Sequence, residues 1–430
     1  MQSALLSNRF YRFQSPLHST IQKVFQARLD NRRDRAQEFH AVNAPVAYDV
    51  LFYYSRSIPM FLHCIAHILC SLSSLQSSAN DNEAKFFGPP VMLTSPSMFV
   101  KAGESYFDPQ TKRIIFQAIE HPKDGETVSD DYSMYVADLT FDAKGAISGI
   151  SNIVKISHDG SANTCGWFHP SKQNTVLFAT TTTKRTDEQV PGYQRDSGDY
   201  RWAFPPEMNI VECELTNPKA QKPLIVDNEH YIAEGSWSPD GRHVLFCSLE
   251  GGDGDIYVRD LERNITTHLV HAPGYDGGPF FSPDGKRITY RSDRAKNDLL
   301  QLYVSELKFD EHGTIVGVQK EHQVTSNQHV NWGPFWHPTG KALLYATSEM
   351  GHYNYEVYMV DVTNLSSLKE GEDAPHQRVT HMPSFDGLPV FNADGTWLMW
   401  TSKRGTDTSQ LWVAPFTFNN WDWAKKDASQ

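Results

Sequence analysis

The sequence predicts an all-β fold, a six-bladed β-propeller whose blades are four-stranded antiparallel sheets. Three observations predict it: one turn phrase recurs six times, a strand of shared form follows each copy, and aromatic residues make up 12% of the chain. Large rings fill the space between packed sheets. A linear stack of such sheets would leave open edges at both ends, and radial closure removes them.

The turn phrase is clearest in residues 276–294, where Ser282-Pro-Asp-Gly285 separates the apolar runs 279–281 and 288–290. Proline presets a φ near −65° and glycine accepts a positive φ, so this tetrapeptide predicts a tight turn. The flanking residues are aromatic or β-branched and predict the two strands of a hairpin. Aligning the copies on the turn proline gives six anchors, the last with alanine instead: Pro109, Pro170, Pro239, Pro283, Pro338 and Ala393.

A third strand follows each hairpin, and a weaker fourth strand such as 266–270 leads into the next copy. The last copy lacks a good fourth strand, whereas residues 90–95 resemble fourth strands elsewhere. We therefore expect residues 90–95 to supply the outer strand of the last blade, so that pairing of the two chain ends closes the ring. Deleting residues 81–100 should sharply destabilise the fold. The third strands are 134–139, 208–215, 255–261, 301–307, 356–362 and 410–416.

The predicted propeller spans residues 85–416, followed by a tail at 417–430. Residues 1–59 form a leader outside the propeller, expected to be disordered or a mis-assigned extension. Residues 60–79 contain a short apolar run, then small polar residues and Ser77-x-Ala79, which is the pattern of a secretory signal with its cleavage site. We expect export on this ground; the alternative is a leader without function.

The composition excludes some classes of protein. The chain has 39 Lys and Arg against 51 Asp and Glu, a net charge of −12, which argues against nucleic-acid binding. No apolar stretch has the length of a membrane-spanning helix, and we expect a monomer. No cysteine lies in a C-x-x-C pair, and the cysteine spacings suggest no zinc site. Cys165, Cys213 and Cys247 lie in predicted strands, so we expect small buried thiols there rather than a disulfide or a catalytic role. The cysteines are Cys64, Cys70, Cys165, Cys213 and Cys247.

The phrase Ser-Pro-Asp-Gly-Lys/Arg, followed by an apolar strand and Ser-Asp-Arg, resembles the WD40-like repeat of TolB-like propellers. Residues 240–242, 284–287 and 291–294 carry the resemblance most clearly, and it extends over about residues 85–416. TolB is a periplasmic propeller that follows a small α/β domain and binds protein partners at the cell envelope. The resemblance therefore implies a non-catalytic, exported propeller that binds a protein, peptide or carbohydrate of the envelope at the channel mouth. The residues before the propeller do not look like that α/β domain, so a role in a Tol-Pal system is not expected.

Two enzyme classes carry similar propellers. Prolyl-oligopeptidase-like serine peptidases need a hydrolase domain with a G-x-S-x-G motif, and only residues 417–430 follow here, so we do not expect a peptidase. The alternative function is a metal-dependent, carbohydrate-active enzyme resembling oligogalacturonate lyase, which uses a His-rich metal site with an arginine. His337 occupies a turn position on the face opposite His329, so the candidate cluster is not coherent. Its members are His329, His337, His352, His376 and His381.

Acidic and amide residues recur just before the turns. Each copy has Asp, Asn or Glu either seven or five residues before its anchor, and positions two apart point the same way on a regular strand. We therefore expect one such side chain from every blade at the mouth of the channel. The ring could bind a hydrated cation such as Ca²⁺ or a basic peptide group, or it could seal the channel by bonding neighbouring blades. Its members are Glu104, Asn163, Glu234, Asp276, Asn331 and Asp386.

Other loops on the same face carry basic and aromatic residues. Arginine and lysine follow several second strands, and some should pair with the acidic ring; these are Arg291, Arg294, Lys296, Lys403 and Arg404. The longest insertion, residues 181–207, contains Arg195, Tyr200, Arg201 and Trp202. That composition favours a contact surface for a partner, and a flexible surface loop without a binding role is the alternative. Apart from the possible Ca²⁺, no cofactor is expected.

Overall fold

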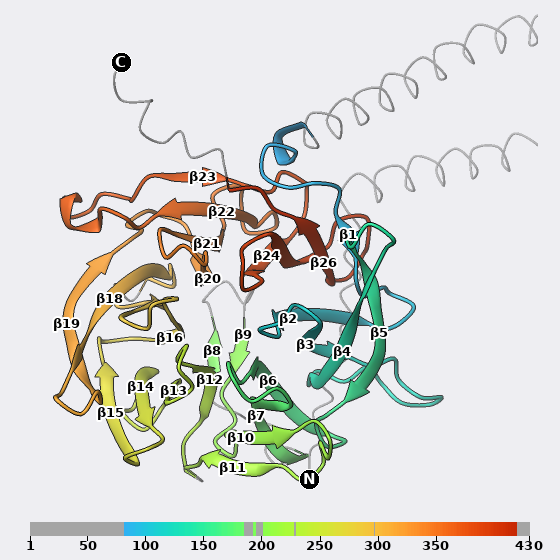
Figure 1. The fold of residues 1–430 in the computed structure, drawn as a ribbon, viewed down its shortest axis with the longest axis horizontal. Helices are drawn as coiled ribbons and strands as arrows, with labels where there is room; N and C mark the ends of the chain where they lie inside the picture. Colours follow the sequence, from blue (N-terminus) through green and yellow to red (C-terminus); the bar gives the residue numbers. More distant parts are fainter. Residues whose placement is uncertain (1–80, 185–191, 195–200, 228, 296, 419–430) are drawn as a thin grey trace, which may run out of the picture. The chain divides into compact units, whose positions relative to one another are not determined.

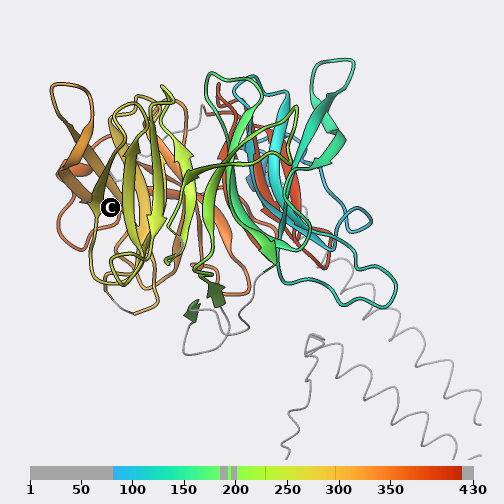
Figure 2. The same cartoon turned by 90° about the horizontal axis from the view of Figure 1, so that it is seen from below.

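The computed structural model describes residues 81–184, 192–194, 201–227, 229–295 and 297–418. The side chains of 192–194 and 201–203 fall outside this description. Six four-stranded antiparallel sheets surround one axis, which confirms the predicted six-bladed propeller (Figure 1). Seen from the side in Figure 2, the sheets stand roughly along the axis, and a short hairpin projects from one face.

Blades 1 to 3 run outward from the axis in strand order. Blade 1 consists of β2 (Lys101–Phe107), β3 (Arg113–Ile119), β4 (Ser133–Phe141) and β5 (Ile147–Lys155). Blade 2 consists of β6 (Ser161–Phe168), β7 (Thr175–Lys184), β10 (Asn209–Glu214) and β11 (Lys222–Ile225). The two-stranded hairpin β8 (Gly192–Gln194) and β9 (Arg201–Ala203) is inserted between β7 and β10. Blade 3 consists of β12 (Ile232–Trp237), β13 (His243–Ser248), β14 (Asp255–Asp260) and β15 (Ile265–Val270).

Blades 4 and 5 repeat the arrangement, and blade 6 is completed from the other end of the chain. Blade 4 consists of β16 (Asp276–Phe281), β17 (Arg287–Ser292), β18 (Gln301–Phe309) and β19 (Ile315–Gln323). Blade 5 consists of β20 (Asn331–Trp336), β21 (Ala342–Thr347), β22 (Glu356–Asp361) and β23 (His376–Arg378), with the 3₁₀ turn η2 (Leu365–Ser367) before β23. Blade 6 consists of β24 (Asp386–Phe391), β25 (Trp397–Ser402), β26 (Gln410–Pro415) and β1 (Val91–Met92).

The N-terminal segment closes the ring, as the sequence predicts. β1 pairs antiparallel with β26, Val91 opposite Val413 and Met92 opposite Trp412, and Phe87 forms a further bridge to Phe416. The hydroxyl of Thr94 donates to the Gln410 side chain at 2.8 Å. The paired strand is shorter than the predicted 90–95, and the bridge at Phe87 extends the contact toward the N-terminus instead.

The proline turns lie on the face opposite the cavity described below, and they join neighbouring blades. In the blade-4 turn, Ser282 donates to the Asp284 carboxylate at 2.5 Å and accepts from the Arg287 amide at 2.9 Å. The turn glycine also packs against the turn of the preceding blade. A Cβ on Gly285 would lie 3.6 Å from Pro239, and one on Gly395, whose φ is +74°, would lie 2.8 Å from the His337 ring. Glycine therefore serves both the turn conformation and the contact between blades.

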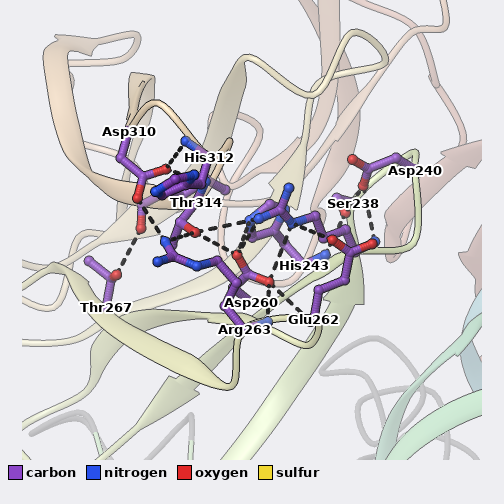
Figure 3. Close-up of polar contacts among 12 residues, drawn as sticks. Ser238, Asp240, His243, Asp260, Glu262, Arg263, Thr267, Asp310, His312 and Thr314 are labelled. Carbon is purple, nitrogen blue, oxygen red and sulfur yellow. Dashed lines mark hydrogen bonds and ion pairs between the residues drawn. The ribbon is translucent and has the colours of Figure 1, made fainter.

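Charged side chains on the turn face tie blade 3 to blade 4 (Figure 3). Arg242 pairs with Asp260 at 2.7 Å, and the Thr314 hydroxyl donates to the same carboxylate at 2.7 Å. Arg263 pairs with Asp310 at 2.9 Å. Burial raises the pKa of Asp260, but the bonds from Arg242 and Thr314 outweigh it and hold that pKa well below its usual range. The network is a structural clamp between hairpin loops.

The cysteines that the structure describes are free and buried, as predicted: Cys165, Cys213 and Cys247. Cys64 and Cys70 lie outside the described residues. Among the described residues, no helix has both the length and the apolar character needed to cross a membrane.

Candidate functional site: a cavity at the mouth of the propeller

Four aromatic rings fill the centre of the propeller. They come from the position three residues before the anchor in blades 1, 2, 4 and 5, where the side chains are Tyr106, Trp167, Phe280 and Phe335. Every pair among them is in ring contact, with centroids 4.6 to 6.2 Å apart. Blades 3 and 6 place the smaller Ser236 and Val390 at this position. Because mutually contacting rings from both sides of the axis fill the centre, the channel is blocked between its two faces.

A cavity of about 1090 Å³ lies on one side of this plug and is lined by residues of all six blades. Tyr106 and Phe280 form part of its lining, so the plug is its floor. The other lining residues come from the starts of inner strands and from loops between second and third strands, which is the face that the topology predicts for the channel mouth. A drug-sized or peptide-sized group fits a volume of this order.

A bulge in every inner strand sets which side chains reach the cavity. Strand pairing shifts in each blade around the position five residues before the anchor. All six residues at this position have a positive φ, between 41° and 60°. A bulge of this kind interrupts the alternation of side chains, so positions seven and five before the anchor no longer share one direction. The six residues are Glu104, Cys165, Glu234, Gly278, Gly333 and Leu388.

The predicted ring of acidic and amide residues is divided as the bulge requires in every blade except blade 2, where Asn163 also reaches the cavity. Glu104, Glu234 and Asn163 line the cavity. Asp276, Asn331 and Asp386 do not line it, and each is buried. The expected single ring at the mouth is therefore not formed, because the prediction assumed an uninterrupted strand.

The three residues that do not line the cavity form hydrogen bonds or ion pairs with neighbouring residues. Asp276 accepts from the Ala272 amide at 2.9 Å and pairs with Arg294 at 3.4 Å. Asp386 accepts from Trp400 at 3.0 Å and pairs with Arg404 at 3.0 Å. The Asn331 amide donates to Gln301, Asn327 and His329.

The predicted basic residues are divided in the same way. Arg291 lines the cavity, whereas Arg294 and Arg404 do not. Arg404 is buried and also pairs with Glu83 of the N-terminal segment at 3.0 Å. Lys403 is exposed, and Lys296 lies outside the described residues.

Glu234 is fully engaged within the wall of the cavity. Its carboxylate pairs with Arg291 at 2.8 Å and accepts from the Tyr275 hydroxyl at 2.6 Å and from the Gly278 amide. The Arg291 guanidinium also lies 5.4 Å from the centre of the Tyr275 ring. Glu234 and Arg291 are both buried, so this group of side chains is a fixed part of the wall.

Glu104 lies in the same wall and is half-buried. It accepts from the Tyr106 hydroxyl at 3.2 Å and from the Thr164 hydroxyl at 3.3 Å. Among the residues that the structure describes, no Lys, Arg or His comes within 4.0 Å of its carboxylate. Burial raises the pKa of Glu104; the hydrogen bond from the Cys165 thiol and the Arg291 charge lower it, and the Glu234 charge raises it, so that the net shift is upward. Burial, followed by the Glu104 charge, also raises the pKa of the neighbouring Cys165 thiol, which is therefore a poor nucleophile.

Aromatic side chains form much of the remaining wall and rim. Tyr132, Trp332 and Phe385 line the cavity, and the Lys101 ammonium lies 4.9 Å from the centre of the Tyr132 ring. Trp332 and Phe385 are in ring contact at 6.3 Å. The lining therefore presents flat apolar faces beside four carboxylates, two ammonium groups and one guanidinium; the charged residues are Glu104, Asp130, Asp131, Glu234, Lys101, Lys184 and Arg291.

The blade-2 insertion lies on the cavity side. Lys184 and Pro205, at its two ends, line the cavity, and Figures 1 and 2 show β8 and β9 near the axis and projecting from that face. The loop residues Arg195 and Tyr200 lie outside the described residues. Arg201 and Trp202 belong to β9, whose side chains are not described. The predicted contact surface on this loop thus stays a prediction.

The structure gives the predicted metal sites no support within the residues it describes. There, no group of three or more His, Cys, Asp or Glu side chains is placed to hold a metal ion. His337 lies on the turn face, stacked on Phe418 with centroids 3.9 Å apart, and burial lowers its pKa to about 4. His376 instead pairs with Glu349 at 3.3 Å. Calcium binding has not been tested and stays a prediction.

Parts of the chain are similar in sequence to known proteins. No model of a known protein family matches the chain. An uncharacterized protein of Agrobacterium fabrum is 27% identical over 119 residues, which are 28% of this chain and 37% of that protein. The Tol-Pal system protein TolB of Francisella tularensis is 30% identical over 84 residues, 20% of this chain and 19% of TolB. The chain thus spans well under half the length of the curated relatives it matches, and the resemblance of its repeat to that of TolB is confirmed.

Solved structures with a similar fold include TolB from Acinetobacter baumannii, with 17% identity and a TM-score of 0.47 over 71% of this chain and 64% of that one. A putative TolB from Agrobacterium tumefaciens has 14% identity and a TM-score of 0.44 over 74% and 90% of the two chains. An oligogalacturonate lyase from Vibrio parahaemolyticus has 12% identity and a TM-score of 0.41 over 76% and 93%.

Proposed function

We propose that this chain is an exported, non-catalytic TolB-like propeller that holds part of an envelope partner in its central cavity. The partner is a protein, a peptide or a carbohydrate, and the propeller acts as a monomer. The observation that carries the proposal is the cavity itself, because it is closed below by the four-ring plug and lined by every blade.

The chemistry of the lining supports binding rather than catalysis. Glu234, one of the two glutamates of the lining, is paired with Arg291, and the Cys165 thiol has a raised pKa, so neither of these two groups is prepared as a nucleophile or a proton-transfer group. Flat aromatic faces beside a few polar groups are typical of recognition sites. The sequence match to TolB, which is named as a protein of the Tol-Pal system, supports the same interpretation.

A cavity-blocking variant tests the proposal. Ser409 is half-buried in the lining, so Ser409→Trp should fill part of the cavity without removing a core contact. Ser151→Trp, on the outermost strand β5 of blade 1, is the matched control. We expect the tagged chain in the osmotic-shock fraction, and expect the parent and Ser151→Trp to capture a partner from envelope extract that Ser409→Trp fails to capture.

The proposal would be contradicted in two ways. One is recovery of the protein only with the cytoplasmic fraction. The other is capture of the same partner, at the same yield, by Ser409→Trp and by the parent, provided that both variants melt at the parent temperature.

A further inference from the structure

Two blades place a glutamate at the same point of the repeat, but among the described residues only one of these glutamates forms an ion pair with an arginine. Glu104 in blade 1 and Glu234 in blade 3 both lie five residues before the anchor, in the inner-strand bulge. Glu234 is paired with Arg291 of the next blade at 2.8 Å. Among the described residues, Glu104 instead accepts from the Tyr106 and Thr164 hydroxyls, at 3.2 and 3.3 Å, and from the Cys165 thiol.

The register of the strands explains the difference. Arg291 lies opposite Gly277, which is six residues before the blade-4 anchor. The corresponding residue of blade 2 is Thr164, and it lies opposite Ala179. Ala179 thus occupies in blade 2 the place that Arg291 occupies in blade 4. Within the described residues, the repeat therefore leaves the Glu104 carboxylate facing the cavity without the ion pair that its counterpart has, although the Arg291 charge acts on it from a longer distance.

We infer that the cavity recognises a cationic side chain of its partner, a lysine or an arginine, and that Glu104 is the carboxylate that receives it. The inference rests on the proposed function, since it names the chemistry by which the same cavity holds its partner. A partly desolvated carboxylate is costly when no cation is near, and a charged donor brought by the ligand removes that cost. An incoming ammonium or guanidinium would stand where Arg291 stands in relation to Glu234.

The rest of the lining favours a cation as well. The rings of Tyr106, Tyr132 and Trp332 line the cavity that Glu104 faces, and aromatic faces attract cations, more strongly where water is excluded. The Lys101 ammonium near the Tyr132 ring shows such a contact at the rim. The lining holds four carboxylates against the three cations Lys101, Lys184 and Arg291, so an anionic ligand would meet a net negative charge. A neutral sugar would gain hydrogen bonds but no charge pairing with Glu104.

Titration of the purified full chain with short capped peptides tests the inference. The probes are Gly-Gly-Lys-Gly-Gly and the same peptide with acetyl-lysine, which keeps the length and removes the charge. A second pair contains arginine and its neutral counterpart citrulline. The signal is the fluorescence change or the heat of binding. We expect each cationic peptide to bind about tenfold or more tightly than its neutral partner, as one charge-assisted hydrogen bond predicts.

Two variants locate the effect. Glu104→Gln keeps the shape of the side chain and should erase the preference for the cationic peptides. Ala179→Arg places an arginine in blade 2 at the position that Arg291 has in blade 4. This arginine should form an ion pair with Glu104 and so also erase the preference for the cationic peptides. Ala179 is fully buried, so this variant could fail to fold, in which case Glu104→Gln alone decides.

Three results would overturn the inference: equal binding of charged and neutral peptides by the parent, no binding at millimolar concentration, or a preference that survives Glu104→Gln. Tighter binding of a neutral oligosaccharide such as chitotetraose, lost in Glu104→Gln, would instead assign Glu104 to a sugar. Any of these leaves the proposed function intact if Ser409→Trp still abolishes partner capture. If Ser409→Trp captures the partner as well as the parent does, the proposed function itself is contradicted.

Discussion

Single residues at the mouth face show why the site could be predicted only in part. The acidic and amide positions of the repeat are visible in the sequence, and each of them does lie at the start of an inner strand. Their orientation was not predictable, because the bulge residue is Glu, Cys or Leu in four blades and glycine, which signals a positive φ, only at Gly278 and Gly333. Two ion pairs are visible in the sequence as a repeated spacing, because Asp276 and Arg294, like Asp386 and Arg404, are 18 positions apart.

Glu356 makes the residue-scale account testable through pH. It is fully buried, accepts from Arg378 at 2.6 Å and from Thr380 at 2.5 Å, and burial together with the Asp386 charge raises its pKa to about 8. The unfolded chain titrates Glu near 4.3. The folded state therefore binds more protons between these values, and stability should fall as the pH rises from about 4 to 8, by up to about 1.4 kcal/mol per pH unit from this group.

Glu356→Gln should flatten this part of the stability profile, because the amide does not titrate. Urea unfolding at pH 5, 6.5 and 8 measures it, with the exposed Glu370→Gln as the control that should keep the parent slope. A Glu356→Gln variant with the same slope as the parent would show that the carboxyl is ionised in the folded protein at neutral pH.

At the scale of elements, the sequence predicted the hairpins, the third strands and the closing strand. These predictions succeeded because turn chemistry is local and because an open sheet edge is unfavourable wherever it occurs. The central plug was not predicted, although its signal was present: Tyr106, Trp167, Phe280 and Phe335 all stand three residues before an anchor. A periodic aromatic position is ambiguous in a sequence, since rings fill sheet interfaces as readily as they fill the axis.

The closing segment yields the element-scale prediction. Phe87 is 4% exposed and contacts Trp400 with ring centroids 5.4 Å apart, whereas Met92, five residues later, is 38% exposed. Phe87→Ala should lower the free energy of unfolding by about 3–5 kcal/mol, the usual cost of deleting a buried ring. Met92→Ala should change it by about 0.5 kcal/mol or less. Equilibrium unfolding in urea measures both, and equal, small effects would show that the segment does not fasten the ring.

At the scale of the whole molecule, the two faces of the propeller have separate tasks. The turn face carries the Pro-Asp-Gly phrases and the Arg242–Asp260 clamp, which hold blades together. The opposite face carries the cavity, the blade-2 insertion and the aromatic rim. The most recognisable motif of the sequence therefore builds the ring, and the positions that vary from blade to blade shape the binding site.

Photo-crosslinking from within the cavity tests this division most directly. Benzoylphenylalanine at Phe385, which lines the cavity, should give a covalent adduct with one envelope partner after irradiation of intact cells. The same residue at Phe309, 40% exposed at the turn-face end of β18, should give none. An adduct from Phe309 and none from Phe385 would contradict the account, because the partner would then bind the turn face.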